Sequence, residues 1–314
     1  MKKLLFLLLL SLFSTSGAGA KVAGPVGIFD LRYTLNYDYT DPARLMLVWD
    51  DCHTVATLQG VVNRDFIIFY VGCYDNPAWT SRNTLTLWDD PNRGKLPLMW
   101  CVTPIIEQRA PHVLHHWRKS ASPNDYFAAG DNGAGYTSVG QLQKPRLSGV
   151  PDGCRAWAEH CKPYYEKWGL SVTGFIINTF APPMGDRLLD AFQSFSYNGI
   201  VPNGDGLTQA RLYKGMPVLK SVTSLTNPNP QSNKKMTLDE CAQTIARSVK
   251  NRQPFHFHWY RAINMSPTWY VELMERVHKL NPNIVLLDTP AYFELLRIWL
   301  EQNPDAFPLP ERQQ

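Results

Sequence analysis

Short apolar runs alternate with segments of helical periodicity from residue 66 onward, and this alternation limits the possible folds more than any other feature. Thr237 with Glu240 has the pattern of a capping box, and Ser266 before Pro267 has that of an N-cap followed by a first-turn proline. Strand-like runs separated by helices predict parallel strands joined by crossover connections. The strand-like runs lie at residues 66–71, 96–101, 126–129, 172–178, 198–201, 216–222, 254–259 and 284–287.

Eight such strands predict an α/β fold, a (β/α)8, TIM-like barrel. The runs at 126–129 and 198–201 are short, so the sequence also fits a seven-stranded variant. Residues 66–302 would form this barrel, close to the size of about 200–250 residues that such barrels reach as single domains. Residues 21–65 would form a short N-terminal flap packed on the barrel, and residues 303–314 a C-terminal tail.

Residues 1–20 have the pattern of a secretory signal peptide. Lys2 and Lys3 precede an apolar run at residues 4–13, and Ala18 and Ala20 form an A-x-A cleavage site. The apolar run is too short to span a bilayer, and no other run approaches the length of a transmembrane helix. We therefore expect a secreted or periplasmic protein without a membrane span once the leader is removed.

The charge and cysteine content exclude some classes of protein. The formal net charge is +4, two of these charges lie in the leader, and the chain has no basic run, which argues against a nucleic-acid partner. No cysteine pair has the C-x-x-C spacing of a zinc site. Cys154 and Cys161 would lie roughly 10 Å apart on one helix, too far for a disulfide. We expect most of the cysteines to be buried free thiols; they are Cys52, Cys73, Cys101, Cys154, Cys161 and Cys241.

A glycine-rich turn, residues 130–136 (GDNGAGY), follows the third predicted strand. Its glycines permit a tight bend, so we expect positive φ at Gly133 or Gly135 and a Tyr136 side chain that reaches into a pocket. A phosphate-binding loop would lead straight into a helix, often with a lysine, whereas this turn leads into the polar pair Thr137 and Ser138. A nucleotide site is therefore the weaker interpretation, and a simple bend is the alternative to a binding loop.

The same turn resembles the signature of the GxGYxYP family of putative glycoside hydrolases. Gly133, Gly135 and Tyr136 match that string, while Ser138 and Val139 stand where the family has Tyr and Pro. The resemblance extends from about residue 66 to the end of the chain and implies a role in carbohydrate metabolism. Other segments similar to the family's C-terminal domain are 74–79 (YDNPAW), Arg93-Gly94 with Pro97 and Trp100, and 124–127 (NDYF).

Chemistry in barrels of this kind takes place at the C-terminal ends of the strands. The residues that follow the predicted strands are rich in acids, amides, histidine and tryptophan. Carboxylates and amides bind sugar hydroxyls, and aromatic rings stack on the apolar face of a sugar. We expect substrate contacts from Asn76, Trp79, Trp100, Asn132, Gly135, Tyr136, Asn178, His258, Trp259 and Asp288.

Asp75 and Asp131 are the predicted catalytic pair. Glycoside cleavage usually needs two carboxyl groups, about 5–5.5 Å apart for retention or about 6.5–9.5 Å apart for inversion. Both aspartates follow nearby predicted strands and lie in or beside the family-like segments. Asp205 and Asp288 are the alternatives, and any of the four could instead shape a loop or cap a helix. No Glu follows a predicted strand, although Glu is a common proton donor.

Two other functions fit parts of the sequence. The missing Glu and the departures at Cys73, Ser138 and Val139 favour a non-catalytic carbohydrate-binding barrel. A metal-dependent polysaccharide deacetylase would use Asp75 with His112 and His116, which have i, i+4 spacing on a predicted helix, or the pair at His256 and His258. A surface cluster explains the helical pair better. We expect neither a bound transition metal nor a cofactor, because no three-ligand set follows the predicted strands.

Overall fold

The computed structural model describes residues 64–72, 80–130, 132–143, 149–178, 181–203, 210–219, 224–225, 236–252, 255–262 and 264–304. The predicted leader, nearly all of the predicted flap and residues 305–314 lie outside this description.

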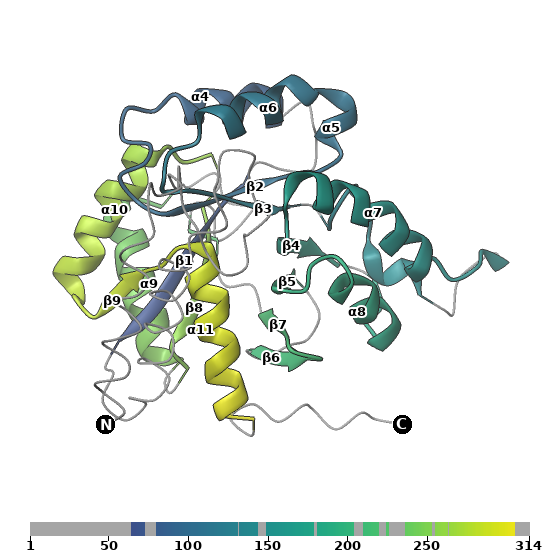
Figure 1. The fold of residues 1–314 in the computed structure, drawn as a ribbon. Helices are drawn as coiled ribbons and strands as arrows, with labels where there is room; N and C mark the ends of the chain where they lie inside the picture. The colour runs from purple at the N-terminus through teal and green to yellow at the C-terminus, as the bar shows by residue number, and fades with distance from the viewer. Residues whose placement is uncertain are drawn as a thin grey trace, which may run out of the picture.

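The described strands form one sheet, with the order β6-β7-β5-β4-β3-β2-β1-β8 and with β9 beside β1 (Figure 1). All strand pairs are parallel except β6 with β7. The strands are β1 (Asp65–Gly72), β2 (Leu98–Val102), β3 (Asp125–Ala129), β4 (Val172–Ile177), β5 (Gly199–Asn203), β6 (Ala210–Tyr213), β7 (Met216–Leu219), β8 (Phe257–Arg261) and β9 (Ile284–Leu286).

Helices connect most of these strands, as the alternation predicts. Thr237 and Glu240 form the predicted capping box, and Ser266 caps the helix that begins at Pro267. None of the described helices is long and apolar enough to cross a membrane. The helical segments are η1 (Thr80–Thr84), α4 (Leu85–Trp88), α5 (Ile106–Arg109), α6 (Pro111–Ser120), η2 (Val139–Leu142), α7 (Cys154–Trp168), α8 (Asp186–Gln193), α9 (Leu238–Asn251), α10 (Pro267–Leu280) and α11 (Thr289–Gln302).

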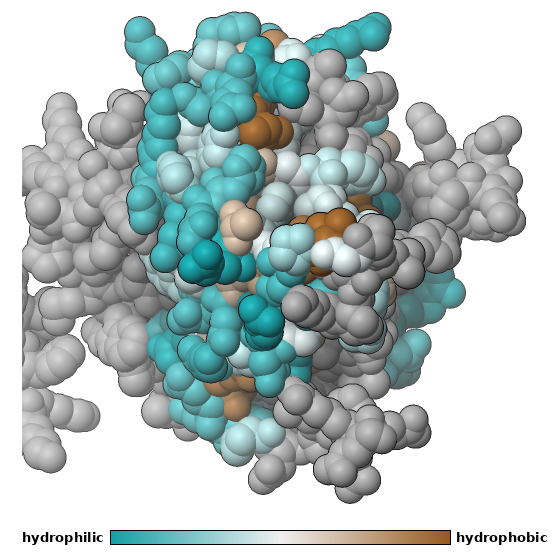
Figure 2. All heavy atoms as spheres, turned by 90° about the vertical axis from the view of Figure 1, so that its right-hand side faces the viewer, coloured by the Kyte–Doolittle hydropathy of each residue, from teal (hydrophilic) through white to brown (hydrophobic). Residues whose placement is uncertain are grey.

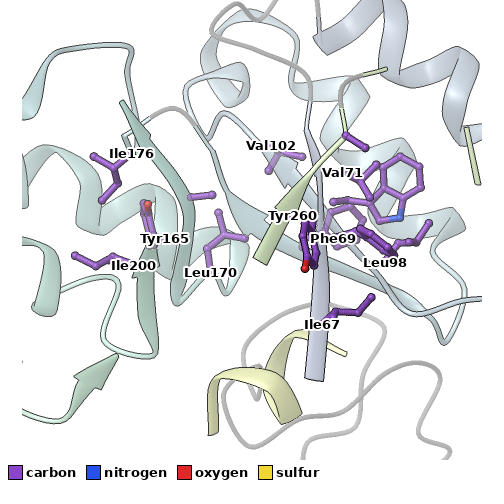
Figure 3. Packing of buried hydrophobic residues seen from close by; sticks show 14 of the residues in the cluster. Ile67, Phe69, Val71, Leu98, Val102, Tyr165, Leu170, Ile176, Ile200 and Tyr260 are labelled. Carbon is purple, nitrogen blue, oxygen red and sulfur yellow. The ribbon is translucent and has the colours of Figure 1, made fainter. Parts of the chain in front are cut away.

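The sheet is buried on both faces. Along β1, Ile67 and Phe69 belong to the cluster that packs against helices α4 to α10, which we call the outer face (Figure 3). Ile68 and Tyr70 belong to a second cluster, shared with α11, which we call the inner face. Burial on both faces explains why the strands read as nearly continuous apolar runs rather than as alternating ones.

Helix α11 covers the inner face. Figure 1 shows it lying across the sheet between β8 and the β6–β7 hairpin, and it contacts β1, β6 and β7. The ring of Phe293 on α11 lies against Gly199, where a Cβ atom would stand only 2.4 Å from Phe293 Cδ1. Gly199 therefore lets the helix approach β5 closely.

The described strands do not close into the predicted eight-stranded barrel. In such a barrel the last strand, here β9, would lie between β8 and β1. Instead, β8 pairs directly with β1. Strand β9 lies on the opposite edge of β1, where it pairs with residues 65–67 while β2 pairs with residues 70–72. One parallel bridge, between Ser224 and Arg261, connects the segment after β7 to β8. The chain is an α/β protein with a curled, mainly parallel sheet.

All four described cysteines are buried, Cys101 among them, and Cys154, Cys161 and Cys241 confirm the expectation of buried free thiols. Cys154 and Cys161 are both on α7 and unbridged, and Cys241 is on α9. Burial raises the pKa of Cys161 to about 12, which keeps its thiol protonated and apolar in character. Cys52 and Cys73 lie outside the described residues.

The surface seen from the α7–α8 side is mainly hydrophilic, with small separate hydrophobic patches (Figure 2). Large hydrophobic side chains of the described residues that are exposed are Tyr136, Val150 and Leu280.

Candidate functional site

The candidate site lies at the edge of the sheet where the parallel strands end, which we call the carboxyl edge. Residues that follow β3 and β4, and the last residue of β8, meet there. Four predicted site residues, Asp75, Asn76, Trp79 and Asp131, lie outside the described residues, so their roles stay predictions. The flanking residues Gly72 and Gly130 are described and show where the chain leaves β1 and β3.

Asn132 holds the glycine-rich turn onto β4. Its side-chain oxygen accepts a hydrogen bond from the Ile177 amide, and its Nδ2 donates to the carbonyl oxygens of Ile177, at 3.1 Å, and Thr137. The residue is buried and has φ of 71°, a left-handed conformation that Asn tolerates. Both polar atoms of the amide bond to backbone, so Asn132 positions the turn and has no free group for the predicted sugar contact.

The prediction of positive φ in the turn is confirmed at Gly133, where φ is 109°. A Cβ atom there would lie 3.0 Å from Cys161 Sγ on α7. A Cβ atom at Gly135 would meet Trp157 at 3.5 Å, which is ordinary contact, so Gly133 is the position that requires glycine. The next aromatic residue, Tyr136, is 55% exposed, so its ring is open to solvent.

Asn178 joins two loops at the carboxyl edge. Its Oδ1 accepts from the Gly140 amide at 2.7 Å, and its Nδ2 donates to the Pro182 carbonyl at 2.8 Å. A Cβ atom at Gly140 would stand 2.1 Å from the Pro182 oxygen, so only glycine permits this approach. Asn178 lies at the strand end, as predicted, but it is buried and its amide fastens the loop after β3 to the loop after β4.

Trp100 does not lie at the carboxyl edge as a stacking platform. It is buried on the outer face, 5.0 Å from the Trp88 ring, and its Nε1 donates to Asp125 Oδ1 at 2.8 Å. Asp125 is the first residue of β3 and also binds Arg93. The strand continues to Val102, so Trp100 is an interior residue of β2, and its ring has no exposed face for a sugar.

Trp259 is also buried, on the inner face, within a group of three aromatic rings. Its ring lies 5.4 Å from that of Tyr70 and stacks on Phe175 at 5.7 Å with an interplanar angle of 6°. Tyr70 was not predicted as a site residue. A Cβ atom on Gly130 would lie only 3.0 Å from the Tyr70 hydroxyl, and the Tyr70 ring also fills the space beside Gly72. Glycines at the ends of β1 and β3, the strands on either side of β2, were the signal that could have identified this tyrosine.

His258 lies far from the carboxyl edge, contrary to its predicted role. It is the second residue of β8 and pairs in register with Ile67, which faces the outer cluster. Its Nε2 lies 3.6 Å from Oδ1 of Asp65, at the amino end of β1, and His256 Nδ1 lies 3.2 Å from the same oxygen. The reason is that β8 begins at Phe257, later than the predicted start at residue 254.

Charge interactions hold this group of Asp65 and two histidines together. Burial raises the pKa of Asp65, but its interactions with His256 and His258 outweigh burial and lower that pKa to about 2. The pKa of His258 is lowered, mainly because burial disfavours the imidazolium form. The group therefore joins the amino ends of β1 and β8 and is structural.

Asp288 caps helix α11, since its Oδ1 accepts a hydrogen bond from the Ala291 amide at 2.8 Å. Asp288 thus has the capping role that the sequence also allowed, and its substrate contact stays a prediction. The alternative acid Asp205 lies outside the described residues.

The described part of the chain contains no group of three His, Cys, Asp or Glu side chains that could hold a metal ion. His112 and His116 are exposed on α6, as a surface cluster would be. A small hollow of about 10 Å³ lies on the outer face, but it is too small for a sugar and its lining is apolar apart from one arginine. It is lined by Val102, Pro104, Leu114, Arg118, Phe127, Trp168 and Leu170.

Comparisons with known proteins agree on the fold and point to one family. A family model described as the GxGYxYP putative glycoside hydrolase C-terminal domain matches residues 63–297. The fold is similar to the crystal structure of a putative hydrolase from Bacteroides thetaiotaomicron VPI-5482, with a TM-score of 0.62 and 17% identity. The match covers 79% of this chain and 46% of that one, so the chain spans about half the length of its solved relative. No curated protein matches the sequence.

Proposed function

Because the chain belongs to the family of GxGYxYP putative glycoside hydrolases, whose C-terminal domain it matches over residues 63–297, we propose that it hydrolyses a glycosidic bond in an oligo- or polysaccharide. The observation that carries this proposal is the convergence of the ends of β1 and β3 beside the Tyr70 hydroxyl. These two ends lead directly into the segments that contain Asp75 and Asp131.

The sheet geometry supports these two aspartates as a catalytic pair. Strands β1 and β3 flank β2, so their ends lie roughly 10 Å apart, twice the spacing of neighbouring strands. Asp131 follows Gly130 directly, and Asp75 lies three residues after Gly72. With a similar separation of their carboxyl groups, the two aspartates would fit the roughly 6.5–9.5 Å of inverting enzymes better than the shorter retaining distance. One aspartate would protonate the leaving oxygen while the other activates water.

The glycine-rich turn would supply part of the sugar-binding surface. Gly133 gives the bend, Asn132 and Asn178 fix the two loops, and Tyr136 presents an exposed ring at the end of the turn. An exposed aromatic ring on a rigidly held loop can stack on the apolar face of a sugar. Export through the leader pattern at residues 1–20 would bring such an enzyme to extracellular or periplasmic polysaccharides.

A non-catalytic carbohydrate-binding protein is the second candidate. It is favoured by one observation: Asn132, Asn178 and Asp288, three of the predicted polar contacts, use their side chains to hold loops or cap a helix. A chain that kept the scaffold and the exposed Tyr136 could bind saccharides without cleaving them.

A screen of the purified chain against a glycan panel separates the two candidates, provided that binding and cleavage are scored separately. Hydrolysis of at least one glycan, with release of new reducing ends, is the expected result. Binding without hydrolysis across the panel would instead support the binding protein. NMR analysis of the first-formed anomer then tests the inverting geometry, since a retained configuration would contradict it.

A further inference from the structure

Arg261 is the last residue of β8, so it lies at the carboxyl edge of the sheet. Its side chain lies on the inner face. Its register partner on β1 is Tyr70, and paired residues of neighbouring parallel strands point to the same side of the sheet. The guanidinium lies 4.8 Å from the centroid of the Phe175 ring on β4, so the side chain extends over the inner face. Arg261 therefore lies beside the tyrosine that marks the candidate site.

No described carboxylate neutralises Arg261. By contrast, two other partly buried arginines form close ion pairs: Arg93 with Asp125 at 2.5 Å, and Arg297 with Glu294 at 2.6 Å. The Arg261 side chain makes no hydrogen bond or ion pair with any residue that the structure describes, while its backbone carbonyl accepts a hydrogen bond from the Leu225 amide. Arg261 is partly exposed, so its guanidinium can be reached by a ligand from solvent.

Aromatic stacking prepares this guanidinium for an anion. Stacking on Phe175 uses the flat face of the group and leaves the N–H donors at its edge free. Trp259 stacks on Phe175 in turn, which holds the ring in position. The buried Trp259 Nε1 also lacks an acceptor in the described part, so this end of the inner face has two donors whose acceptors are not among the described residues.

We propose that Arg261 forms a subsite for a negatively charged sugar, and that the substrate carries a carboxylate or a sulfate ester next to the bond that is cleaved. The planar fork of arginine binds either group through paired, charge-assisted hydrogen bonds. This inference rests on the proposed function, because it places the subsite beside the proposed catalytic edge. It narrows the substrate class from saccharides in general to anionic ones.

The test compares oligouronides, sulfated oligosaccharides and neutral oligosaccharides of equal length, with binding measured by calorimetry and cleavage by new reducing ends. The wild-type chain is expected to bind one anionic class at least about tenfold more tightly than the neutral class. Arg261→Gln should remove this preference, and Arg261→Lys should restore part of it. Arg187→Gln is the matched control, because Arg187 is exposed on α8 and pairs only with Asp152 at the surface; it should leave the preference unchanged.

The possible outcomes separate this inference from the proposed function. Equal binding of neutral and anionic glycans, or an anionic preference that survives in folded Arg261→Gln, overturns the subsite. Cleavage of an anionic glycan by that variant at the wild-type rate overturns the subsite but leaves the hydrolase. An Arg261-dependent preference for anionic glycans without any cleavage supports the subsite and overturns the hydrolase. If no glycan of the three classes binds, both are overturned.

Discussion

Single residues explain why parts of this sequence resemble a family motif. In the glycine-rich turn, Gly133 takes the left-handed conformation, whereas the demand at Gly135 is weaker. The Arg93, Trp100 and Asp125 positions also resemble the family, and in the structure they form one buried network on the outer face. Sequence similarity at these three positions therefore reflects the scaffold, and it is no evidence for a catalytic contact.

Gly133→Ala is expected to lower the free energy of unfolding by about 1–3 kcal/mol, because alanine is strained at φ of 109°. Gly135→Ala should lower it by less than about 1 kcal/mol, since its Cβ would meet only an ordinary contact with Trp157. Urea denaturation of both variants measures the difference. Equal losses, or a larger loss at Gly135, would show that the turn is held differently.

Asp125→Ala should be far more damaging, because it leaves Arg93 and the Trp100 indole N–H without their acceptor. Removing one partner of a buried ion pair destabilises a protein by about 3–5 kcal/mol. Asp190→Ala is the control, since the Asp190–Lys214 pair is largely exposed and such pairs contribute at most about 1 kcal/mol. Similar unfolding curves for the two variants would contradict the structural role of the network.

At the scale of helices and strands, the exact positions of the strand ends determined which predicted site residues lie at the carboxyl edge. The apolar run at 254–259 continues as Phe257–Arg261, and apolar character alone does not show where such a run begins to pair. The shift moved His258 to the amino half of β8 and made Arg261 the residue at its end. The sequence analysis also missed β6, although Lys214 and Gly215, with φ of 48° and 81°, form the kind of two-residue turn that joins hairpin strands.

Acid is expected to weaken the contact between the amino ends of β1 and β8. The folded-state pKa of Asp65 is about 2, below its usual 3.8, so its contribution is present above pH 3.8 and is lost as the pH falls through 2. That contribution is on the order of 2 kcal/mol. His258 has a lowered pKa as well, so the unfolded chain takes up a proton first, and stability begins to fall below about pH 6.5.

Denaturation at a series of pH values measures these two steps. Asp65→Asn should remove the step between pH 4 and 2, while a surface variant such as Asp89→Asn should keep it. A wild-type stability that is constant from pH 7 to 4, or that rises on acidification, would contradict the assignment of the group.

At the scale of the whole molecule, the alternation of runs and helices correctly predicted a mainly parallel α/β sheet with helices between its strands. It also predicted a closed barrel, which the described strands do not form, because the edge of β1 on which β9 lies depends on packing between distant elements. Helix α11 was predicted as a helix, but its place on the inner face follows from the fit of Phe293 against Gly199. The inner-face residues Tyr70 and Arg261 escaped prediction for the same reason.

The central claim is that the carboxyl edge of this sheet cleaves glycosidic bonds with Asp75 and Asp131. The most direct test is kcat/KM on the best glycan of the panel for Asp75→Asn and Asp131→Asn, with exposed Asp89→Asn as the control. Each of the first two variants should lose about 10²–10⁴-fold in rate while staying folded, and the control should match the wild-type chain. A wild-type rate in either Asp75→Asn or Asp131→Asn would contradict the claim.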